Sequence, residues 1–355
     1  MALDPDPLGR ARLRRRRRIW VSVLVAALAA GMVVSVGTGP VMLDAATVAH
    51  VVWSRLSGQS PGSLVDSTAA AIVWDLRLPR VVLGSAVGAG LAVCGMALQA
   101  MVRNPLADPY LLGISAGASS GAAAMILFGV GVGLGARALP ASAFLGALAA
   151  SMMVFLVAGA GGRVSSMRLL LAGVAIGYAL TAVTSLLVFA SGSAEGARSV
   201  MFWLLGSLTL ATWDSLLAIV VMVVVATTGL LTLCGQRLDA LAIGDETAQI
   251  LGVAPGRFRA QLLLVASLCI GVVVASAGSI GFVGLVVPHL ARRLVGAAHA
   301  WAIPVAALLG AILLMWADLC ARMLLQPQEL PVGIITAFMG APFLLYLIRR
   351  MPPAH

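Results

Sequence analysis

The sequence predicts an all-α polytopic membrane protein with about ten transmembrane helices and both termini in the cytoplasm. Of its 355 residues, 61% are hydrophobic and only 10% are charged, whereas a soluble domain carries about a quarter charged residues. A spanning helix needs roughly 20 apolar residues, so ten crossings use about 200 residues and leave no large domain outside the bilayer. These proportions exclude an ordinary soluble protein, a coiled coil and a disordered chain.

The charge of the chain is strongly positive, at +10, and all 23 basic residues are arginine. Such a balance indicates nucleic-acid binding in a soluble protein. In a membrane protein it is more typical of arginine retained on the cytoplasmic face. We therefore expect no nucleic-acid partner.

The first crossing follows a basic tail at residues 1–18, which carries seven arginines between Arg10 and Arg18. The apolar stretch from Ile19 to Leu43 is longer than the 7–15 residues of a signal-peptide core. We interpret it as a retained helix, and the arginines before it place the N-terminus in the cytoplasm.

The following crossings are separated by charged residues. One crossing each is predicted for seven apolar blocks: 80–103, 108–137, 137–163, 168–195, 214–237, 301–325 and 331–348. The 32 residues between Arg259 and Arg292 would make a helix of about 48 Å, too long for one crossing. If the arginines at both ends are cytoplasmic, this block crosses twice and turns near residues 277–281.

This topology places 17 arginines in the cytoplasm and six outside, in agreement with the positive-inside rule. The six are Arg55, Arg77, Arg80, Arg137, Arg198 and Arg322. The expected domain organisation is one membrane domain over residues 19–350, followed by a short cytoplasmic tail at 351–355.

A polar connection at about residues 238–255 is the longest one predicted inside the cell. Asp245 and Glu246 follow Gly244, which suits the N-terminus of a helix, and Gly252 and Pro255 suit its end. A short helix parallel to the membrane surface is expected. It is either a simple connector or a docking helix for a cytoplasmic partner.

Residues for catalysis are scarce. Without lysine there is no phosphate-binding loop, so an ATPase active site must lie on another chain. No metal-ligand spacing is present, and we expect no metal or cofactor on this chain. Asp318 and Arg322 lie four residues apart on one helix face, as a structural ion pair or as a functional charge pair. An intramembrane enzyme using His289 and an ion-gradient-coupled carrier remain as alternatives; the acids at loop edges argue against the carrier.

Eight motifs in order resemble the permease subunits of type II ABC importers for ferric siderophores, heme and cobalamin, the FecCD/BtuC-like family. The resemblance runs from about residue 70 to the C-terminus. The motifs are Arg77-Leu-Pro-Arg80, Gln99 with 103–109, 111–117, 169–175, 202–207, Gly244-Asp-Glu-Thr-Ala, 281–289 and 329–334.

The resemblance implies a role for several residues. Gly244, Asp245, Glu246, Thr247 and Gly252 match a coupling helix that docks in a cleft of the ATPase subunit.

Two further sets of residues match positions in the family. Arg77, Arg80 and Arg322 match arginines that meet acidic residues on a substrate-binding protein. Positions near the cytoplasmic gate are matched by Asn104, Leu106, Ser165 and Ser166.

The function implied is an importer permease in the cytoplasmic (inner) membrane that is not itself an enzyme. Its expected partners are a second permease subunit, identical or closely related, two cytoplasmic ATPase subunits that use ATP and Mg²⁺, and an extracytoplasmic binding protein. A ferric siderophore is the expected cargo, with heme and cobalamin as alternatives.

Overall fold

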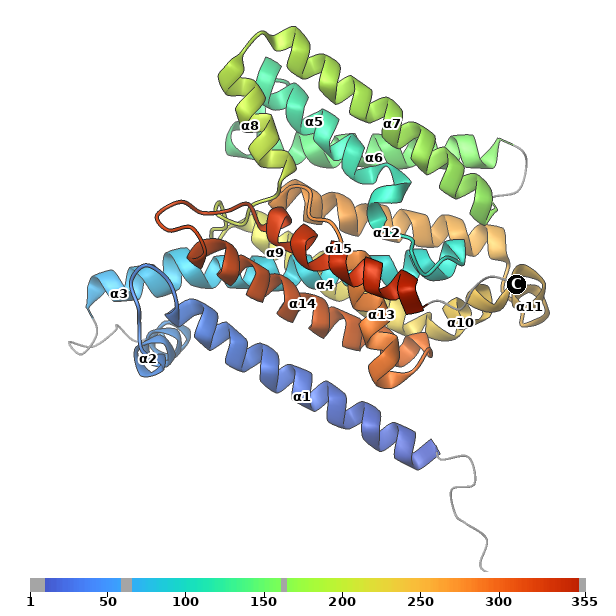
Figure 1. The fold of residues 1–355 in the computed structure, drawn as a ribbon, viewed down its shortest axis with the longest axis horizontal. Helices are drawn as coiled ribbons and strands as arrows, with labels where there is room; N and C mark the ends of the chain where they lie inside the picture. Colours follow the sequence, from blue (N-terminus) through green and yellow to red (C-terminus); the bar gives the residue numbers. More distant parts are fainter. Residues whose placement is uncertain (1–9, 59–65, 161–164, 351–355) are drawn as a thin grey trace, which may run out of the picture.

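The computed structural model describes residues 10–58, 66–160 and 165–350, and every regular element within these ranges is a helix (Figure 1). The elements in order are α1 (Arg10–Gly37), α2 (Ala45–Leu56), α3 (Ser67–Ala71), η1 (Ile72–Arg77), α4 (Leu78–Val102), η2 (Pro109–Leu112), α5 (Ile114–Phe128), η3 (Val132–Arg137), α6 (Ala138–Gly159), α7 (Ser166–Ser191), α8 (Ala194–Leu204), α9 (Ser215–Leu233), α10 (Gly235–Ile243), α11 (Asp245–Ile250), α12 (Pro255–Ala277), α13 (Val283–Val295), α14 (His299–Met323) and α15 (Val332–Arg350).

Seven helical stretches in the described residues are long and apolar enough to cross a membrane. They are α1, the continuous run from α3 to α4, η3 with α6, α7, α9, α12 and α14. Two shorter apolar helices cover Ile114–Phe128 and Val332–Leu347. The predicted all-helical membrane architecture is confirmed, while the count of ten crossings and the cytoplasmic termini stay predictions.

Helix α4 forms the centre of the bundle and is buried along almost its whole length. It packs against α14, α12, α13 and α9 (Figure 1). The close approach depends on glycine: a Cβ on Gly88 would lie 2.1 Å from the carbonyl oxygen of Gly310, and one on Gly95 would lie 2.0 Å from that of Gly284. Small residues at such crossings let helix backbones meet in lipid.

Helices α5, α6, α7 and α8 form a second group, drawn in green at the top of Figure 1. Its central contact joins α5 to α6, where a Cβ on Gly117 would lie 2.3 Å from the carbonyl oxygen of Gly146. This group meets the rest of the bundle largely through α6 and α5 on α12.

The long block between Arg259 and Arg292 is divided as predicted. Helix α12 ends at Ala277, where Gly278 has a φ of 72°, and α13 starts after Phe282, whose φ is 68°. Helix α13 has only 13 residues. At about 1.5 Å per residue it is too short to span the hydrocarbon core alone.

Two predicted boundaries are wrong. Helix α1 begins at Arg10, so the described part of the basic tail is helical, and it ends at Gly37 rather than at Leu43. Asp44 then caps a separate helix, α2, by accepting a hydrogen bond from the amide of Thr47. In the cytoplasmic connection the structure has two helices, α10 and α11, where one was expected.

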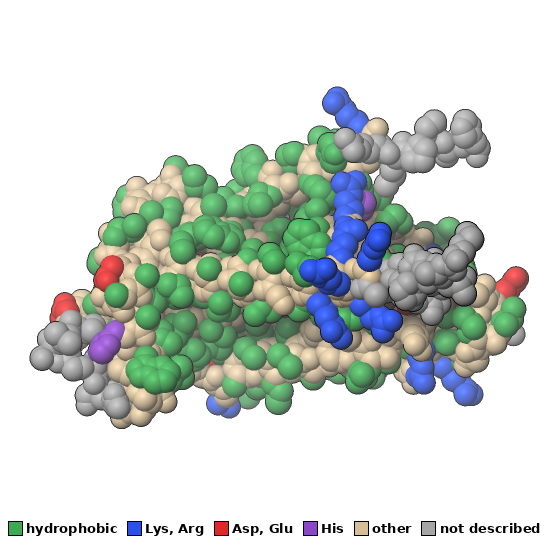
Figure 2. Space-filling view, turned by 90° about the horizontal axis from the view of Figure 1, so that it is seen from below, with side chains coloured by type: hydrophobic (Ala, Val, Ile, Leu, Met, Phe, Trp, Pro, Cys, Tyr) green, Lys and Arg blue, Asp and Glu red, His purple; other side chains and the backbone are tan. Residues whose placement is uncertain are grey.

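The surface agrees with a bilayer environment. Figure 2 shows apolar side chains over most of the visible face and arginines gathered toward one end of the molecule. That end carries the first turns of α1, in which the arginine run lies.

Candidate functional site

The cytoplasmic connection is fixed to the bundle through Arg259 on α12, whose side chain is only 1% exposed. Its guanidinium donates two hydrogen bonds to the carboxylate of Asp245, from Nη1 at 2.9 Å and Nη2 at 2.6 Å. A third donor, Nε, reaches the carbonyl oxygen of Met101 at the end of α4, at 3.2 Å. Paired charge-assisted bonds of this kind fix orientation as well as position. Helix α11 is thereby joined to α12 and α4.

Asp245 supplies the negative charge of the ion pair with Arg259. The hydrogen bonds from Arg259 lower the pKa of Asp245, against partial desolvation, and Arg103 adds a weaker attraction at 3.9 Å. Because that pKa lies below its usual value, the carboxylate stays ionised at neutral pH. The link is therefore intact throughout the physiological range.

The predicted gate residues lie around the end of α4. Ser166 donates from Oγ to the carbonyl oxygen of Met101 at 3.0 Å, the same acceptor that Arg259 uses. Ser165 caps α7 by accepting from the amide of Arg168. These contacts bring α7, α12 and α4 together.

A turn follows α4 and contains the other two predicted gate residues. Asn104 Oδ1 accepts a hydrogen bond from the amide of Leu106 at 2.9 Å. Arg103 just before it has a φ of 52°, the left-handed conformation that ends α4. The structure thus places Asn104 and Leu106 just after α4, and Asn104 lines a cavity together with Ile243 at the end of α10.

The remaining predicted coupling residues lie on α11 or in the turns on either side of it. Glu246 is exposed and Thr247 half-buried, while Gly252 has a φ of 77° in the turn before α12. Gly244 joins α10 to α11 in an extended conformation. None of these residues has an ion pair in the described chain except Asp245.

Three apolar residues around α11 were not predicted to belong to this site. Ile243 is 70% exposed, Ile250 86% and Leu251 62%. Large apolar side chains exposed together outside a membrane mark a protein interaction surface. The signal was present in the sequence as aliphatic residues on either side of the polar stretch Gly244-Asp-Glu-Thr.

A second link to the cytoplasmic helices joins α10 to α14. Asp239 Oδ1 accepts from the amide of His299 at 3.0 Å and lies 2.6 Å from its Nδ1. Burial raises the pKa of Asp239, but the bonds from His299 outweigh it and hold that pKa below its usual value. Nearby, Arg292 donates to Gln99 Oε1, which lies within one of the recognised motifs. A cavity of about 570 Å³ opens between these residues.

The three predicted docking arginines lie together at the opposite end of the bundle. Arg80 contacts Asp318 at 2.9 Å and Glu329 at 2.8 Å, and Arg322 Nε lies 3.2 Å from Asp318. The i, i+4 pair of Asp318 and Arg322 therefore forms as an internal ion pair. Asp318 is 2% exposed and Arg322 5%, so this cluster joins α4, α14 and the segment before α15.

Arg77 is bound to backbone rather than to acids. Its guanidinium donates to the carbonyl oxygens of Val36 at 2.8 Å, Gly37 at 3.2 Å and Val41 at 2.6 Å, just where α1 ends. The side chain of Arg322 likewise donates to Ser35 Oγ at 2.9 Å. In this conformation the donors are occupied inside the protein, and a docking role for the three arginines stays a prediction.

His289 lies within α13, with its ring edge-on to Phe343 at 6.0 Å between centroids. Its Nε2 is buried without a hydrogen-bond partner among the described residues. No group of three His, Cys, Asp or Glu side chains in the described chain could hold a metal ion. The ring of His289 thus packs against an aromatic side chain of α15.

Comparison with known proteins gives the family. The model of the FecCD transport family matches residues 18–350. The chain is 46% identical over 285 residues to the cobalamin import system permease protein BtuC of Halobacterium salinarum, covering 80% of this chain and 75% of that one. It is 38% identical over 310 residues to the Fe(3+)-citrate import system permease protein YfmD of Bacillus subtilis, covering 82% and 89%.

A solved structure described as an inward-facing conformation of a metal-chelate type ABC transporter superposes with a TM-score of 0.80. It is 30% identical and covers 93% of this chain and 99% of its own. The chain thus belongs to the FecCD transport family, the permeases of ABC importers.

Proposed function

We propose that this chain forms, with a second permease subunit, the pathway by which a ferric siderophore crosses the cytoplasmic membrane. A binding protein delivers the cargo on the outer side, and two ATPase subunits drive its movement from the cytoplasm. Family membership supports this assignment. The seven long apolar stretches with α5 and α15 account for nine of the ten predicted crossings, and α13 together with residues 278–282 would complete the tenth, with the arginine-rich end inside.

The observation that carries the proposal is the construction of α11. Ile250 on α11 is exposed, as are Ile243 and Leu251 on either side of this helix, while Arg259 joins Asp245 to α12 and to the end of α4. An apolar surface around a short helix that is held by an ion pair to a buried arginine suits a mechanical contact. The ATPase subunit would push on this surface, and the pair would transmit the displacement to α12 and α4.

The outer cluster is the proposed docking surface for the binding protein. Glu329 is 41% exposed and pairs with Arg80, so an acidic side chain of the partner would compete with Glu329 for the guanidinium. Arg77 and Arg322 would support this surface by fixing the ends of α1 and α14. Pairs of this kind set orientation and encounter rate more than affinity.

Cobalamin is the second candidate cargo, favoured by the 46% identity to the Halobacterium permease. Heme is a third, implied by the family resemblance. The motifs belong to the scaffold, and the binding protein holds the cargo, so the permease sequence carries little information on the choice between them.

The test is reconstitution of the permease with its ATPase subunits in liposomes that contain ATP, with binding protein loaded with a ferric siderophore, cobalamin or heme outside. We expect ATP-dependent accumulation of the ferric siderophore and none with a non-hydrolysable ATP analogue. Accumulation driven by a proton gradient without ATP would instead indicate an ion-coupled carrier. ATP-dependent uptake of cobalamin or heme alone would keep the importer and change the cargo.

A further inference from the structure

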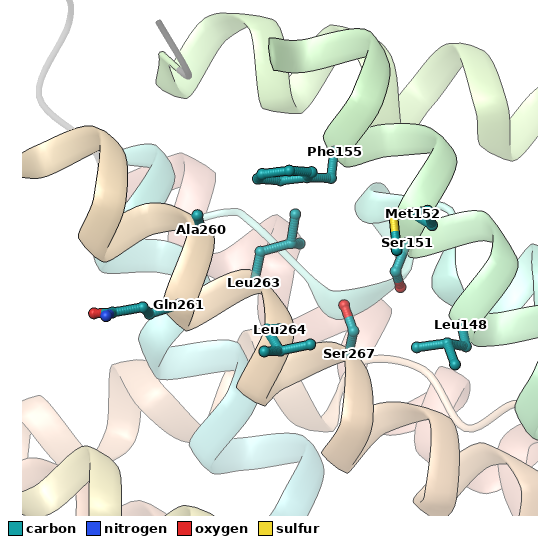
Figure 3. Close-up of a pocket in the computed structure, with 9 residues that line it drawn as sticks. All are labelled: Leu148, Ser151, Met152, Phe155, Ala260, Gln261, Leu263, Leu264 and Ser267. Carbon is teal, nitrogen blue, oxygen red and sulfur yellow. The ribbon is translucent and has the colours of Figure 1, made fainter.

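An apolar groove lies between α6 and α12, outside the contacts used above (Figure 3). Its volume is about 320 Å³, and its lining comes from one stripe of each helix. The lining residues are Leu148, Ser151, Met152, Phe155, Ala260, Gln261, Leu263, Leu264 and Ser267. The groove runs where the α5–α8 group meets the rest of the bundle.

The mouth of the groove opens toward the surface of the membrane domain. Leu264 is 57% exposed, Met152 55% and Phe155 37%. In Figure 3 Phe155 lies across the opening above Leu263, and the amide of Gln261 points away from the groove. Apolar side chains exposed at this depth face acyl chains, so the natural occupant is a hydrocarbon chain.

The groove continues to the cytoplasmic edge. A second cavity of about 760 Å³ shares Phe155 and Ala260 with it and reaches Arg257. Asp245 and Arg259, which neutralise each other as an ion pair, also line this cavity. Arg257 lies one turn from Ala260 on α12, is exposed, and has no ion pair in the described part of the chain. It differs in this from Arg259, whose donors are taken by Asp245 and Met101.

The charge at this edge is complementary to one class of lipid. Arg257 stands in the first turn of α12, where the helix dipole is also positive. A phosphate is favoured at such a place. The cytoplasmic leaflet carries anionic lipids, and each arginine near it adds attraction.

We propose that the groove binds one anionic phospholipid of the cytoplasmic leaflet, with an acyl chain between α6 and α12 and its phosphate on Arg257. The lipid would lie between the two helix groups and so would affect how they move against each other. This inference does not depend on the cargo.

A buried hydroxyl at the inner end of the groove allows an experiment to distinguish a lipid from a polar ligand. Ser267 is 2% exposed, its Oγ has no hydrogen-bond partner among the described residues, and in Figure 3 it faces Ser151. Ser151 itself donates to the carbonyl oxygen of Ala147. An acyl chain makes no use of the Ser267 hydroxyl, whereas a polar ligand would bond to it.

The experiment measures lipid retention by native mass spectrometry on the full chain in detergent, titrated with dioleoyl-phosphatidylglycerol or dioleoyl-phosphatidylcholine. The unchanged chain should retain one phosphatidylglycerol in preference to phosphatidylcholine. Arg257→Gln should weaken phosphatidylglycerol binding about fivefold and leave phosphatidylcholine unchanged. Leu264→Trp should fill the mouth and weaken both lipids. Ser267→Val should leave retention unchanged or raise it.

The matched controls are Arg168→Gln, another exposed arginine near the same end, and Met222→Trp, an exposed apolar residue on α9. Both should bind phosphatidylglycerol as the unchanged chain does. Equal losses in the controls and in the groove variants would overturn the proposal. So would a loss on Ser267→Val, which indicates a polar ligand, or chain-to-chain disulfides from Leu264→Cys, which would show that a second copy covers the groove.

Discussion

Replacing Asp245 by Asn tests whether the pair with Arg259 holds α11 in place. The change removes the negative charge and one of the two hydrogen bonds that Arg259 donates. Two bonds to a charged group contribute up to about 3 kcal/mol when buried. Asp245 is 36% exposed, so solvent reduces the loss to about 1.4 kcal/mol. This corresponds to about a tenfold rise in the ratio of detached to attached α11.

Hydrogen exchange measures this ratio directly, because amides in a locally opened segment exchange in proportion to the open population. We expect protection of the hydrogen-bonded amides of Ala248, Leu251 and Gly252 to fall about tenfold in the purified variant. In the assembled importer, cargo moved per ATP should fall while ATP hydrolysis continues. The same uncoupling is expected when Glu246 is changed together with Asp245.

The control is Arg237→Gln, which removes an exposed arginine of α10 that has no ion pair in the described chain. It should leave both the exchange and the transport ratio unchanged. Protection of the amides of Ala248, Leu251 and Gly252 that stays within twofold in Asp245→Asn would refute the reasoning. Restored protection on exchanging the two charges, in Asp245→Arg with Arg259→Asp, would show that the pair itself matters.

Three further predictions concern packing and charge. Gly88→Val should abolish the monodisperse peak in size-exclusion chromatography, because its Cβ would lie 2.1 Å from the Gly310 carbonyl oxygen. The control Gly229→Ala, where a Cβ meets open space, should keep that peak. A monodisperse Gly88→Val variant beside an aggregated Gly229→Ala variant would contradict the packing. Asp318→Asn should lower the free energy of unfolding by about 3–5 kcal/mol, because Arg80 and Arg322 then lack their buried acidic partner. A change below about 1 kcal/mol in the free energy of unfolding would refute this. The pKa of Asp239 is lower in the folded chain than in the unfolded chain, so the stabilisation by its carboxylate is complete above the unfolded pKa and is lost as pH falls through the folded pKa. Asp239→Asn should therefore make the melting temperature depend less on pH in the acid range. A melting temperature that falls with pH as steeply as in the unchanged chain would count against this.

The motifs predicted where the three outer arginines lie but not what their side chains contact. The sequence grouped Arg77, Arg80 and Arg322 as outward residues, and the structure places them together at one end of the bundle. It did not indicate that Arg77 would bind the carbonyl groups at the end of α1. That contact joins residues about 40 positions apart, and no local pattern records it.

In the cytoplasmic segment, too, the sequence predicted one feature and missed another. The acids after Gly244 predicted a helix start, and α11 begins there. The preceding helix α10 was missed because its apolar and polar residues also suit a connector. Likewise the division of the block after Arg259 into two helices was predicted from the parity of the charges, whereas the charges did not indicate that α13 has only 13 residues and packs against α4 and α14.

Hydropathy and the order of charges determined that this chain is a membrane helix bundle, because backbone polar groups in lipid must be satisfied within helices and each crossing needs a fixed apolar length. Only the tertiary structure decided which charges remain available to partners. Arg257 and Arg259 are two residues apart, yet one is exposed and the other is 1% exposed and bonded to α11 and α4. The difference arises from the direction each side chain takes around one helix, and the neighbours that fill each direction come from distant parts of the chain.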